Sequence, residues 1–178
     1  DKFYLKLALK LAKQNEGLTS ENPSVGCVIV KKGKVISLSK TSINGRPHAE
    51  DNAIREASSH DLKGSIMYVT LEPCTHHGRT PPCTDLIIKN QISKVVYGSN
   101  DIDDRTANNL KNALNKHNIT TKRIIIKEIS DFYKSYFFIR KNKFPYITAK
   151  LACSKDYYIY SKKNKHITNE LSRKTSHL

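Results

Sequence analysis

The chain has 178 residues, 38% of them hydrophobic, which suits one domain of ordinary size plus a piece of another. No apolar run approaches the roughly 20 residues of a membrane span and no secretory segment stands at the start, so we expect a cytoplasmic protein with no membrane partner. The formal net charge of +15 makes nucleic acid a competing partner, but the excess is lysine scattered along the chain, without an arginine cluster or interleaved aromatics, which indicates a solvated surface and no nucleic-acid partner.

The predicted elements alternate between helices and strands after an opening hairpin. Apolar residues at helical spacing predict a helix over 2–15, and strands are expected at 26–30 and 35–38, joined by a turn at Lys32 and Gly33. Further on we expect helices at 48–59, 82–90, 107–116 and 129–140, and strands at 66–71, 94–97 and 121–127. This alternation predicts a mixed sheet with parallel pairs, covered by helices on both faces. The helix at 129–140 offers several apolar side chains for packing: Phe132, Tyr133, Tyr136, Phe137 and Ile139.

Three possible metal ligands and a carboxylate follow one another in a characteristic order. Glu50 stands two residues after His48, and Cys83 stands nine residues after Cys74. In zinc deaminases one His and two Cys hold Zn²⁺, and the Glu two residues after the His is a general acid/base that does not touch the metal. The fourth coordination position stays open for water. We therefore expect zinc at His48, Cys74 and Cys83, and a catalytic role for Glu50.

Two prolines favour helix starts at these residues. Pro47 and Pro82 each suit the beginning of a helix, where the missing N–H costs nothing, and a helix N-terminus also favours thiolate. Inside a helix His48 and Glu50 would point about 200° apart, so we expect them in the first turn. A structural zinc site, or cysteines that only fill the core, remain alternatives, but neither needs Glu50.

Eight residues separate Cys74 from Cys83, where cytidine, tRNA-adenosine and polynucleotide deaminases typically have two. With this long interval, the segments NPSVGC (22–27), GRPHAE (45–50) and TLEPCTHHGRTPPC (70–83) resemble the deaminase half of the RibD family, the bifunctional deaminase/reductases of bacterial riboflavin biosynthesis. The resemblance implies a cytidine-deaminase-like three-layer α/β/α fold for residues 1–143. Residues 144–178 resemble the opening of a dihydrofolate-reductase-like domain, with its first strand at 146–152. Because so few residues cannot complete such a domain, we expect a fragment without reductase activity.

The resemblance also implies the reaction and its participants. In the family, 2,5-diamino-6-(5-phosphoribosylamino)pyrimidin-4(3H)-one loses its 2-amino group to water, giving 5-amino-6-(5-phosphoribosylamino)uracil and ammonia. A full-length parent is expected to reduce the ribosyl group with NADPH and to form a homo-oligomer. Asn22 is expected to orient the base, Arg79 to meet the phosphate or the ring edge, His76 to line the pocket, and Thr168 to contact the reductase cofactor. An exposed loop charge at Arg79 and a loop-capping role for His76 remain alternatives. A turn before Pro23 explains Asn22 equally well.

Several residues depart from the family pattern. Thr41 stands where the family commonly has His, and Asp101, Ile102, Asp103 and Asp104 replace Asp-Pro-Asn-Pro. An extra Asp near a phosphate is unfavourable unless Arg105 offsets it. Tyr157 replaces the glycine of a turn, although Tyr tolerates positive φ poorly. Glu72 is expected to be a structural hydrogen-bonding residue, and Cys27 and Cys153 are expected in the core.

Two other functions remain open. A nucleoside or tRNA deaminase shares the zinc ligands and Glu50, but not the long interval between the cysteines. A non-catalytic basic RNA-binding module explains the charge but gives the metal ligands and Glu50 no role.

Overall fold

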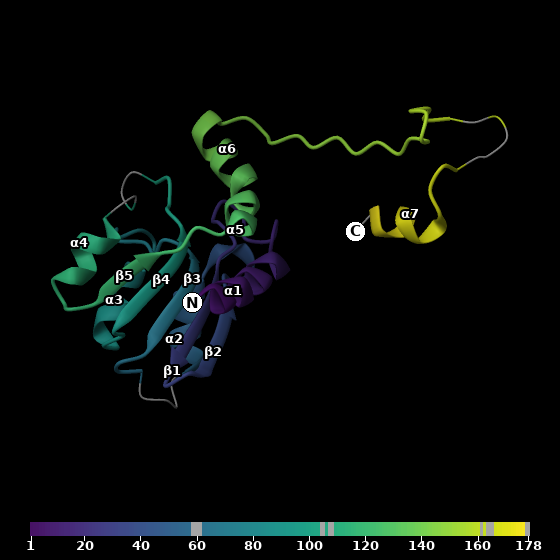
Figure 1. Ribbon diagram of the computed structural model, residues 1–178. Helices are drawn as coiled ribbons and strands as arrows, with labels where there is room; N and C mark the ends of the chain where they lie inside the picture. The colour runs from purple at the N-terminus through teal and green to yellow at the C-terminus, as the bar shows by residue number, and fades with distance from the viewer. Residues whose placement is uncertain (58–61, 104–105, 107–108, 161, 163–165, 177–178) are drawn as a thin grey trace. The chain divides into compact units, whose positions relative to one another are not determined.

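The computed structural model describes residues 1–57, 62–103, 106, 109–160, 162 and 166–176 (Figure 1). The chain divides into two compact units, Asp1–Phe144 and Pro145–Leu178. The assignment of residues 1–143 to a deaminase domain and of residues 144–178 to a reductase fragment stays a prediction. Asp104, Arg105 and the predicted helical residues 58–59 and 107–108 lie outside the described residues.

A five-stranded sheet in the order β2-β1-β3-β4-β5 forms the centre of the first unit. Its strands are β1 (Gly26–Lys31), β2 (Lys34–Lys40), β3 (Ile66–Leu71), β4 (Lys94–Ser99) and β5 (Thr120–Arg123). β1 pairs antiparallel with β2 and β3, whereas β3 with β4 and β4 with β5 are parallel pairs. The predicted mixed sheet is therefore confirmed. β5 ends before the predicted residue 127, because Lys127 already begins a helix.

The hairpin between β1 and β2 turns at Lys32 and Gly33, as predicted. Their φ angles are 49° and 77°, and a two-residue type I′ turn needs positive φ at both positions. Glycine takes such a φ without strain, whereas Lys32 takes it at some cost.

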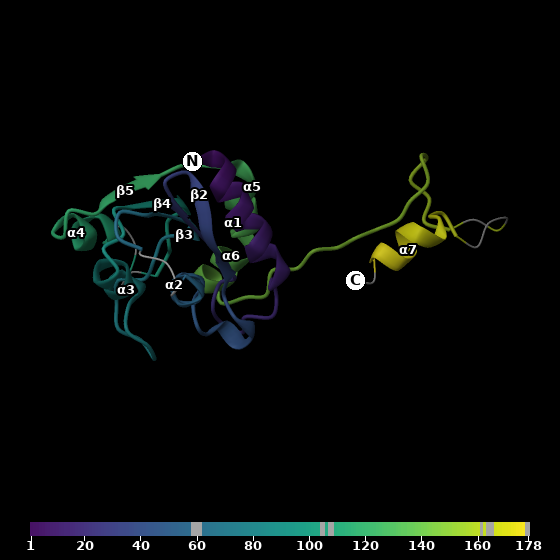
Figure 2. The same ribbon diagram turned by 90° about the horizontal axis from the view of Figure 1, so that it is seen from below.

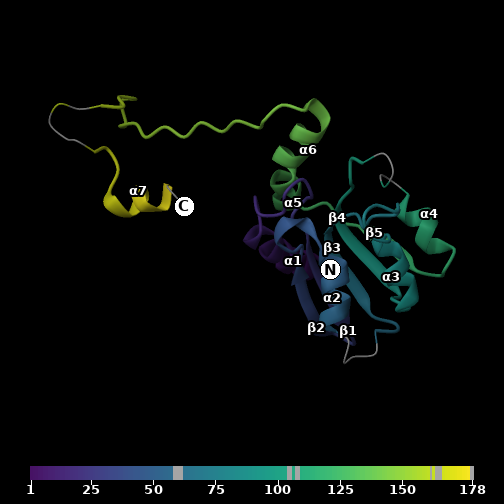
Figure 3. The same cartoon turned by 180° about the vertical axis from the view of Figure 1, so that it is seen from behind.

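Helices cover both faces of this sheet. They are α1 (Lys2–Gln14), α2 (Ala49–Glu56), α3 (Cys83–Lys89), α4 (Leu110–Asn115) and α5 (Lys127–Phe132), with a 3₁₀ turn η1 at Ile43–Gly45. Helix α6 (Lys134–Asn142) follows α5 and extends beyond the end of the sheet (Figure 1). α1 packs on β1, β2 and β3, and α2 packs on β1 and β2. The two helices lie on opposite faces, with α3 beside α2 (Figure 2 and Figure 3). The predicted α/β/α layers are confirmed. Among the described residues, no helix has the length and apolar character that crossing a membrane requires.

The contact between α1 and β1 leaves no room for a side chain at Gly26. A Cβ atom there would lie 1.9 Å from the backbone oxygen of Ala8. The neighbouring Cys27 is fully buried in the core formed by the sheet and its helices, so its predicted core position is confirmed. Glycine at position 26 thus allows the first helix to lie directly on the sheet.

The helix predicted at 129–140 is divided into α5 and α6 at Tyr133, whose ψ is 0°. Tyr133 is 1% exposed. Its hydroxyl lies 2.6 Å from Oγ1 of Thr70 and donates to the backbone oxygen of Ser24 at 3.0 Å. These bonds hold the junction against β3 and the entry to β1. Ile139, by contrast, is 44% exposed and does not pack as expected.

The second unit is described only in itself. Its described residues contain one helix, α7 (Glu170–Ser176). Residues 146–152 form no strand, so that prediction is wrong: a strand is stabilised by a neighbouring strand, and the described residues of this unit provide none. Cys153 is exposed for the same reason, so its predicted core position is also wrong. Tyr157 adopts a φ of 67°, the conformation that the missing glycine would favour.

Candidate metal centre and active site

Three potential ligand atoms meet beside the carboxyl end of β3. Nδ1 of His48 lies 3.7 Å from Sγ of Cys74 and 3.4 Å from Sγ of Cys83, and the three ligand atoms all lie within 4.8 Å of one another. A tetrahedral zinc with usual bond lengths separates its nitrogen and sulfur ligands by about 3.6 Å. The spacing of the three side chains therefore fits zinc without rearrangement.

Two helix starts position these ligands. His48 is the N-cap of α2, with an extended backbone (φ −69°, ψ 161°), and Cys83 is the first residue of α3. Pro47 precedes the N-cap and Pro82 is itself an N-cap, so neither occupies the first helical position, although the missing N–H still costs nothing. The backbone N–H of Cys83 donates to Sγ of Cys74 at 3.2 Å. The α3 start thereby holds the loop cysteine against the other two ligands.

The two thiols differ in acidity. Hydrogen bonding from the Cys83 side chain, together with His48 and the backbone N–H of Cys83, lowers the pKa of Cys74 to about 4. The hydrogen bond with Cys74, and burial, raise the pKa of Cys83 well above its usual value. The pair therefore holds one thiolate and one thiol at neutral pH. Metal binding by both sulfurs releases the remaining proton.

Glu50 is the second residue of α2 and is 4% exposed. Burial raises the pKa of its carboxyl to about 7, Cys74 adds to the rise, and His48 opposes it. A carboxyl group of this pKa takes up and returns protons readily near neutral pH.

Two of the three potential ligands, His48 and Cys74, line a cavity of about 290 Å³ together with Glu50. Glu72 and Cys74 follow β3 and Asp101 follows β4, so the cavity lies at the carboxyl edge of the parallel strands. This is where open α/β sheets bind ligands.

The predicted substrate residues lie along the cavity wall. Nδ2 of Asn22 donates to the backbone oxygen of Gly45 at 3.1 Å, and the backbone oxygen of Asn22 accepts from the Thr19 hydroxyl at 2.7 Å. Asn22 thus shapes a turn and also lines the cavity. Nδ1 of His76 lies 2.9 Å from Oγ1 of Thr106. Arg79 is exposed on the same wall. The structure thus places all three with the metal ligands. Thr168 lies in the second unit, where its oxygen accepts from the guanidinium of Arg173.

Thr41 and Glu72 form hydrogen bonds with backbone N–H groups. Thr41 is buried, and its Oγ1 accepts the N–H of Val25 at 3.0 Å. Glu72 accepts the N–H groups of Asp101 at 3.2 Å and Leu110 at 3.4 Å, which confirms its expected structural role. Burial raises the pKa of Asp101, although the N–H groups that follow it oppose the rise.

Sequence reasoning did not identify several residues of the cavity wall, among them Arg46, Tyr136 and Arg140. Arg46 lines the cavity and donates to the Thr80 hydroxyl at 2.6 Å. Tyr136 and Arg140 line it from α6. The spacing of Tyr136 and Arg140, four residues apart on one helical face, was a usable signal, but it did not reveal that this face turns toward the metal ligands.

The chain is similar to known proteins. Residues 1–99 match the family described as the cytidine and deoxycytidylate deaminase zinc-binding region. The riboflavin biosynthesis protein RibD of Aquifex aeolicus (strain VF5) is 40% identical over 184 residues, which cover 100% of this chain and 51% of that protein. The diaminohydroxyphosphoribosylamino-pyrimidine deaminase of Buchnera aphidicola subsp. Acyrthosiphon pisum (strain APS) is 40% identical over 146 residues, covering 82% of this chain and 99% of that protein.

Solved structures show the same similarity. A crystal structure of a diaminohydroxyphosphoribosylaminopyrimidine deaminase/5-amino-6-(5-phosphoribosylamino)uracil reductase from Thermotoga maritima matches with a TM-score of 0.87 and 35% identity, covering 98% of this chain and 51% of that one. The chain spans about half the length of the RibD relatives it matches. The zinc-binding region and the His/Cys/Cys group together support Zn²⁺ as the metal, and the predicted fold is confirmed. The chain belongs to the RibD family and carries the zinc-binding region of the cytidine and deoxycytidylate deaminases.

Proposed function

We propose that the first unit is a zinc-dependent deaminase of riboflavin biosynthesis. It hydrolyses 2,5-diamino-6-(5-phosphoribosylamino)pyrimidin-4(3H)-one to 5-amino-6-(5-phosphoribosylamino)uracil and ammonia. The observation that carries this proposal is the cluster of His48, Cys74 and Cys83 beside a cavity that His48 and Cys74 line together with buried Glu50. The names of the relatives support the substrate, above all that of the Buchnera deaminase, whose length this chain covers almost completely.

The long interval between the cysteines also supports this substrate over a nucleoside or tRNA. It contributes three cavity-lining residues, namely His76, Gly78 and Arg79. The extra residues that distinguish this chain from the short-interval deaminases therefore lie where a substrate would contact them.

The chain's own groups divide the work of the reaction. His48, Cys74 and Cys83 would hold zinc, which when bound acts as a Lewis acid and lowers the pKa of water at its open position. Glu50 takes one proton from the attacking water and gives it to the ring nitrogen, then moves the second proton of that water from the new hydroxyl group to the departing amine, so that the C–N bond breaks and the products are the uracil and ammonia. Its buried position and its pKa of about 7 suit both directions of transfer.

Asn22 and Arg79 orient the substrate in this proposal. Because Nδ2 of Asn22 donates to the Gly45 oxygen, its Oδ1 is directed to accept from the pyrimidine ring. The Arg79 guanidinium meets the polar edge of the ring or the phosphate. His76, held at Thr106, completes this part of the wall.

For a full-length parent we propose the second RibD activity, reduction of the ribosyl group with NADPH, with Thr168 contacting the cofactor. We further propose that the parent is a cytoplasmic homo-oligomer without a nucleic-acid partner. The combined deaminase and reductase name of the Thermotoga protein supports the second activity.

Ammonia release tests the proposed function. The chain is incubated with the phosphoribosyl diaminopyrimidine, with cytidine and with RNA, each with and without a chelator. We expect ammonia from the diaminopyrimidine alone, loss of activity with the chelator and recovery on adding Zn²⁺. Release mainly from cytidine or RNA would contradict the substrate, and a zinc-loaded chain that releases ammonia from none of them would contradict deamination.

A further inference from the structure

The mouth of the metal cavity is formed by four residues from separate parts of the first unit. Glu21, Asp103, Tyr136 and Arg140 line both the cavity and a second, more open hollow next to it. A substrate whose ring reaches Glu50 extends toward this mouth. Arg140 is the only cation among the four described residues that line both hollows.

Helix α6 presents Arg140 to the mouth because of how it is anchored. Tyr133 and Phe137 are four residues apart, stack with ring centroids 5.7 Å apart, and face the core. Tyr136 and Arg140 form the adjacent row of the same helix, about 60° away from the row of Tyr133. The buried bonds of the Tyr133 hydroxyl to Thr70 and Ser24 fix the rotation of the helix, so this second row faces the cavity.

The other two arginines of the cavity lie elsewhere. Arg46 donates to Thr80. It lies near enough to His48 to affect its pKa: a hydrogen bond with Cys74 raises the pKa of His48, and the positive charge of Arg46 opposes that rise. Arg79 belongs to the loop between the cysteines. Of the three arginines that line the cavity, only Arg140 also lines the outer hollow.

The mouth contains carboxylates, so a cation there determines whether an anion can bind. Asp103 and Glu21 are acidic, and Asp101 lies deeper on the same side. Burial raises the pKa of Tyr136 to about 12, with Asp101 adding to the rise and Arg140 opposing it, so Tyr136 stays a neutral O–H donor beside these carboxylates. Without Arg140 the mouth would repel an anion.

We propose that Arg140 binds the phosphate of the phosphoribosyl group at the mouth of the cavity and thereby makes the site selective for a phosphorylated substrate. This inference rests on the proposed deaminase function. A guanidinium offers paired N–H donors that match phosphate oxygens, and the adjacent Tyr136 hydroxyl adds a neutral donor. The phosphate is the end of the substrate farthest from the departing amine, as the position of Arg140 requires.

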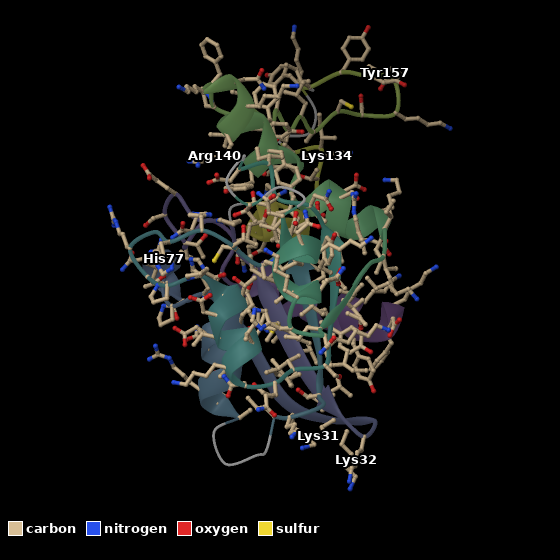
Figure 4. All side chains as sticks on the ribbon, turned by 90° about the vertical axis from the view of Figure 1, so that its left-hand side faces the viewer. Lys31, Lys32, His77, Lys134, Arg140 and Tyr157 are labelled. Carbon is tan, nitrogen blue, oxygen red and sulfur yellow. The ribbon has the colours of Figure 1, made fainter. Side chains whose placement is uncertain are left out.

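The test compares the phosphorylated substrate with its dephosphorylated form in Arg140→Ala, Arg140→Lys and Lys134→Ala. Lys134 is the matched control: it is an exposed cation on the same helix that pairs with Asp131 at 2.6 Å, and Figure 4 shows it and Arg140 on different sides of the helix. Arg140 is itself exposed, so we expect all three variants to keep their zinc content and thermal unfolding midpoint.

We expect Arg140→Ala to lower kcat/KM for the phosphorylated substrate about 10- to 100-fold, mainly through KM, and to leave the dephosphorylated substrate unchanged. Arg140→Lys should keep part of the preference and Lys134→Ala all of it. Equal losses on both substrates, or no loss on either, would overturn the assignment.

A binding measurement keeps this inference separate from the proposed function. Calorimetry compares ribose 5-phosphate with ribose for the unchanged chain and for Arg140→Ala. We expect the phosphate preference to disappear in the variant. If the zinc-loaded chain releases no ammonia, deamination fails, and the calorimetry still decides the role of Arg140: a preference that survives in Arg140→Ala overturns it.

Discussion

Glu50 is the residue on which the proposed chemistry depends most directly, because it is a buried carboxyl in the metal cavity with a pKa of about 7. We expect Glu50→Gln to keep its zinc and to lose deamination by about 100-fold or more, since an amide cannot transfer the proton. Elemental analysis and ammonia release measure the two properties. The control is Glu56→Gln, on the same helix, whose carboxylate accepts from the Ser39 hydroxyl. Near-normal turnover in Glu50→Gln would contradict the assigned role.

Two buried cysteines are expected to differ in function: Cys83 is a proposed metal ligand, and Cys27 is a core residue. We expect Cys83→Ala to lose zinc and activity, because two ligands hold the metal much less tightly than three. Cys27 is equally buried but belongs to β1 and the core, so Cys27→Ala should keep about one zinc per chain. A Cys83→Ala protein with full zinc and full activity would contradict the ligand assignment.

At the scale of residues, the sequence predicted that His48, Cys74 and Cys83 come together, because zinc chemistry restricts both the residue types and their spacing. His48, Cys74 and Cys83 stand out since few other functions require that order together with Glu50. Arg46 and Arg140 did not stand out, because a single arginine is not distinctive in a lysine-rich chain, and the helical spacing of Arg140 with Tyr136 does not show where that helix face turns. Only the packing of α6 shows that Arg140 faces the cavity.

At the scale of elements, Gly26 determines how closely α1 approaches β1. We expect Gly26→Ala to destabilise the unit by about 3 kcal/mol or more, because the clash is with the backbone oxygen of Ala8 and no side-chain rotation relieves it. Gly33→Ala is the control: it has a φ of 77° and no atom within 4 Å of the added Cβ, so it should lose only about 1–2 kcal/mol from backbone strain. Denaturant unfolding measures both. Equal losses in the two variants would show that the α1 contact relaxes.

The junction between α5 and α6 depends on one hydroxyl. Tyr133→Phe removes the bonds to Thr70 and to the backbone oxygen of Ser24, so each of these buried groups loses one partner, although the Thr70 hydroxyl still accepts the N–H of Gly26. We expect a loss of about 1–3 kcal/mol in unfolding free energy. Tyr4→Phe is the matched control, because the Tyr4 hydroxyl makes one exposed bond of 3.3 Å to Gly33 and should matter little. A Tyr133→Phe protein as stable as Tyr4→Phe would contradict this anchoring role.

The same junction shows why element boundaries are harder to predict than elements. Apolar runs placed β1 and β3 correctly, since buried strands carry such runs, whereas β5 is mostly exposed and ends before the predicted residue 127. Periodicity could not divide the helix at Tyr133, because the division follows from a hydroxyl reaching residues distant in the sequence. The strand expected at 146–152 failed for a related reason: its partner must come from another segment.

For the whole molecule, the excess positive charge is not concentrated at the proposed site. Figure 4 shows Lys31 and Lys32 at the β1–β2 hairpin, at the end of the unit away from His77 and Arg140. The cavity itself combines Arg46, Arg79 and Arg140 with several carboxylates. This distribution agrees with the prediction of a solvated basic surface, while selectivity for an anion is assigned to single arginines. Composition alone could not have made that distinction.

The first unit contains everything that the proposed deamination uses. Its core, the three ligands, Glu50 and every residue lining the metal cavity lie within Asp1–Phe144, and a Buchnera deaminase is covered over 99% of its length by 146 aligned residues. We therefore expect a chain truncated after Phe144 to bind zinc, to unfold at the same midpoint and to release ammonia at the same rate as residues 1–178. Glu50→Gln in the truncated chain is the control for contaminating activity. A truncated chain that is folded and zinc-loaded but inactive would show that residues 145–178 contribute to the site, because no group of the first unit would be missing.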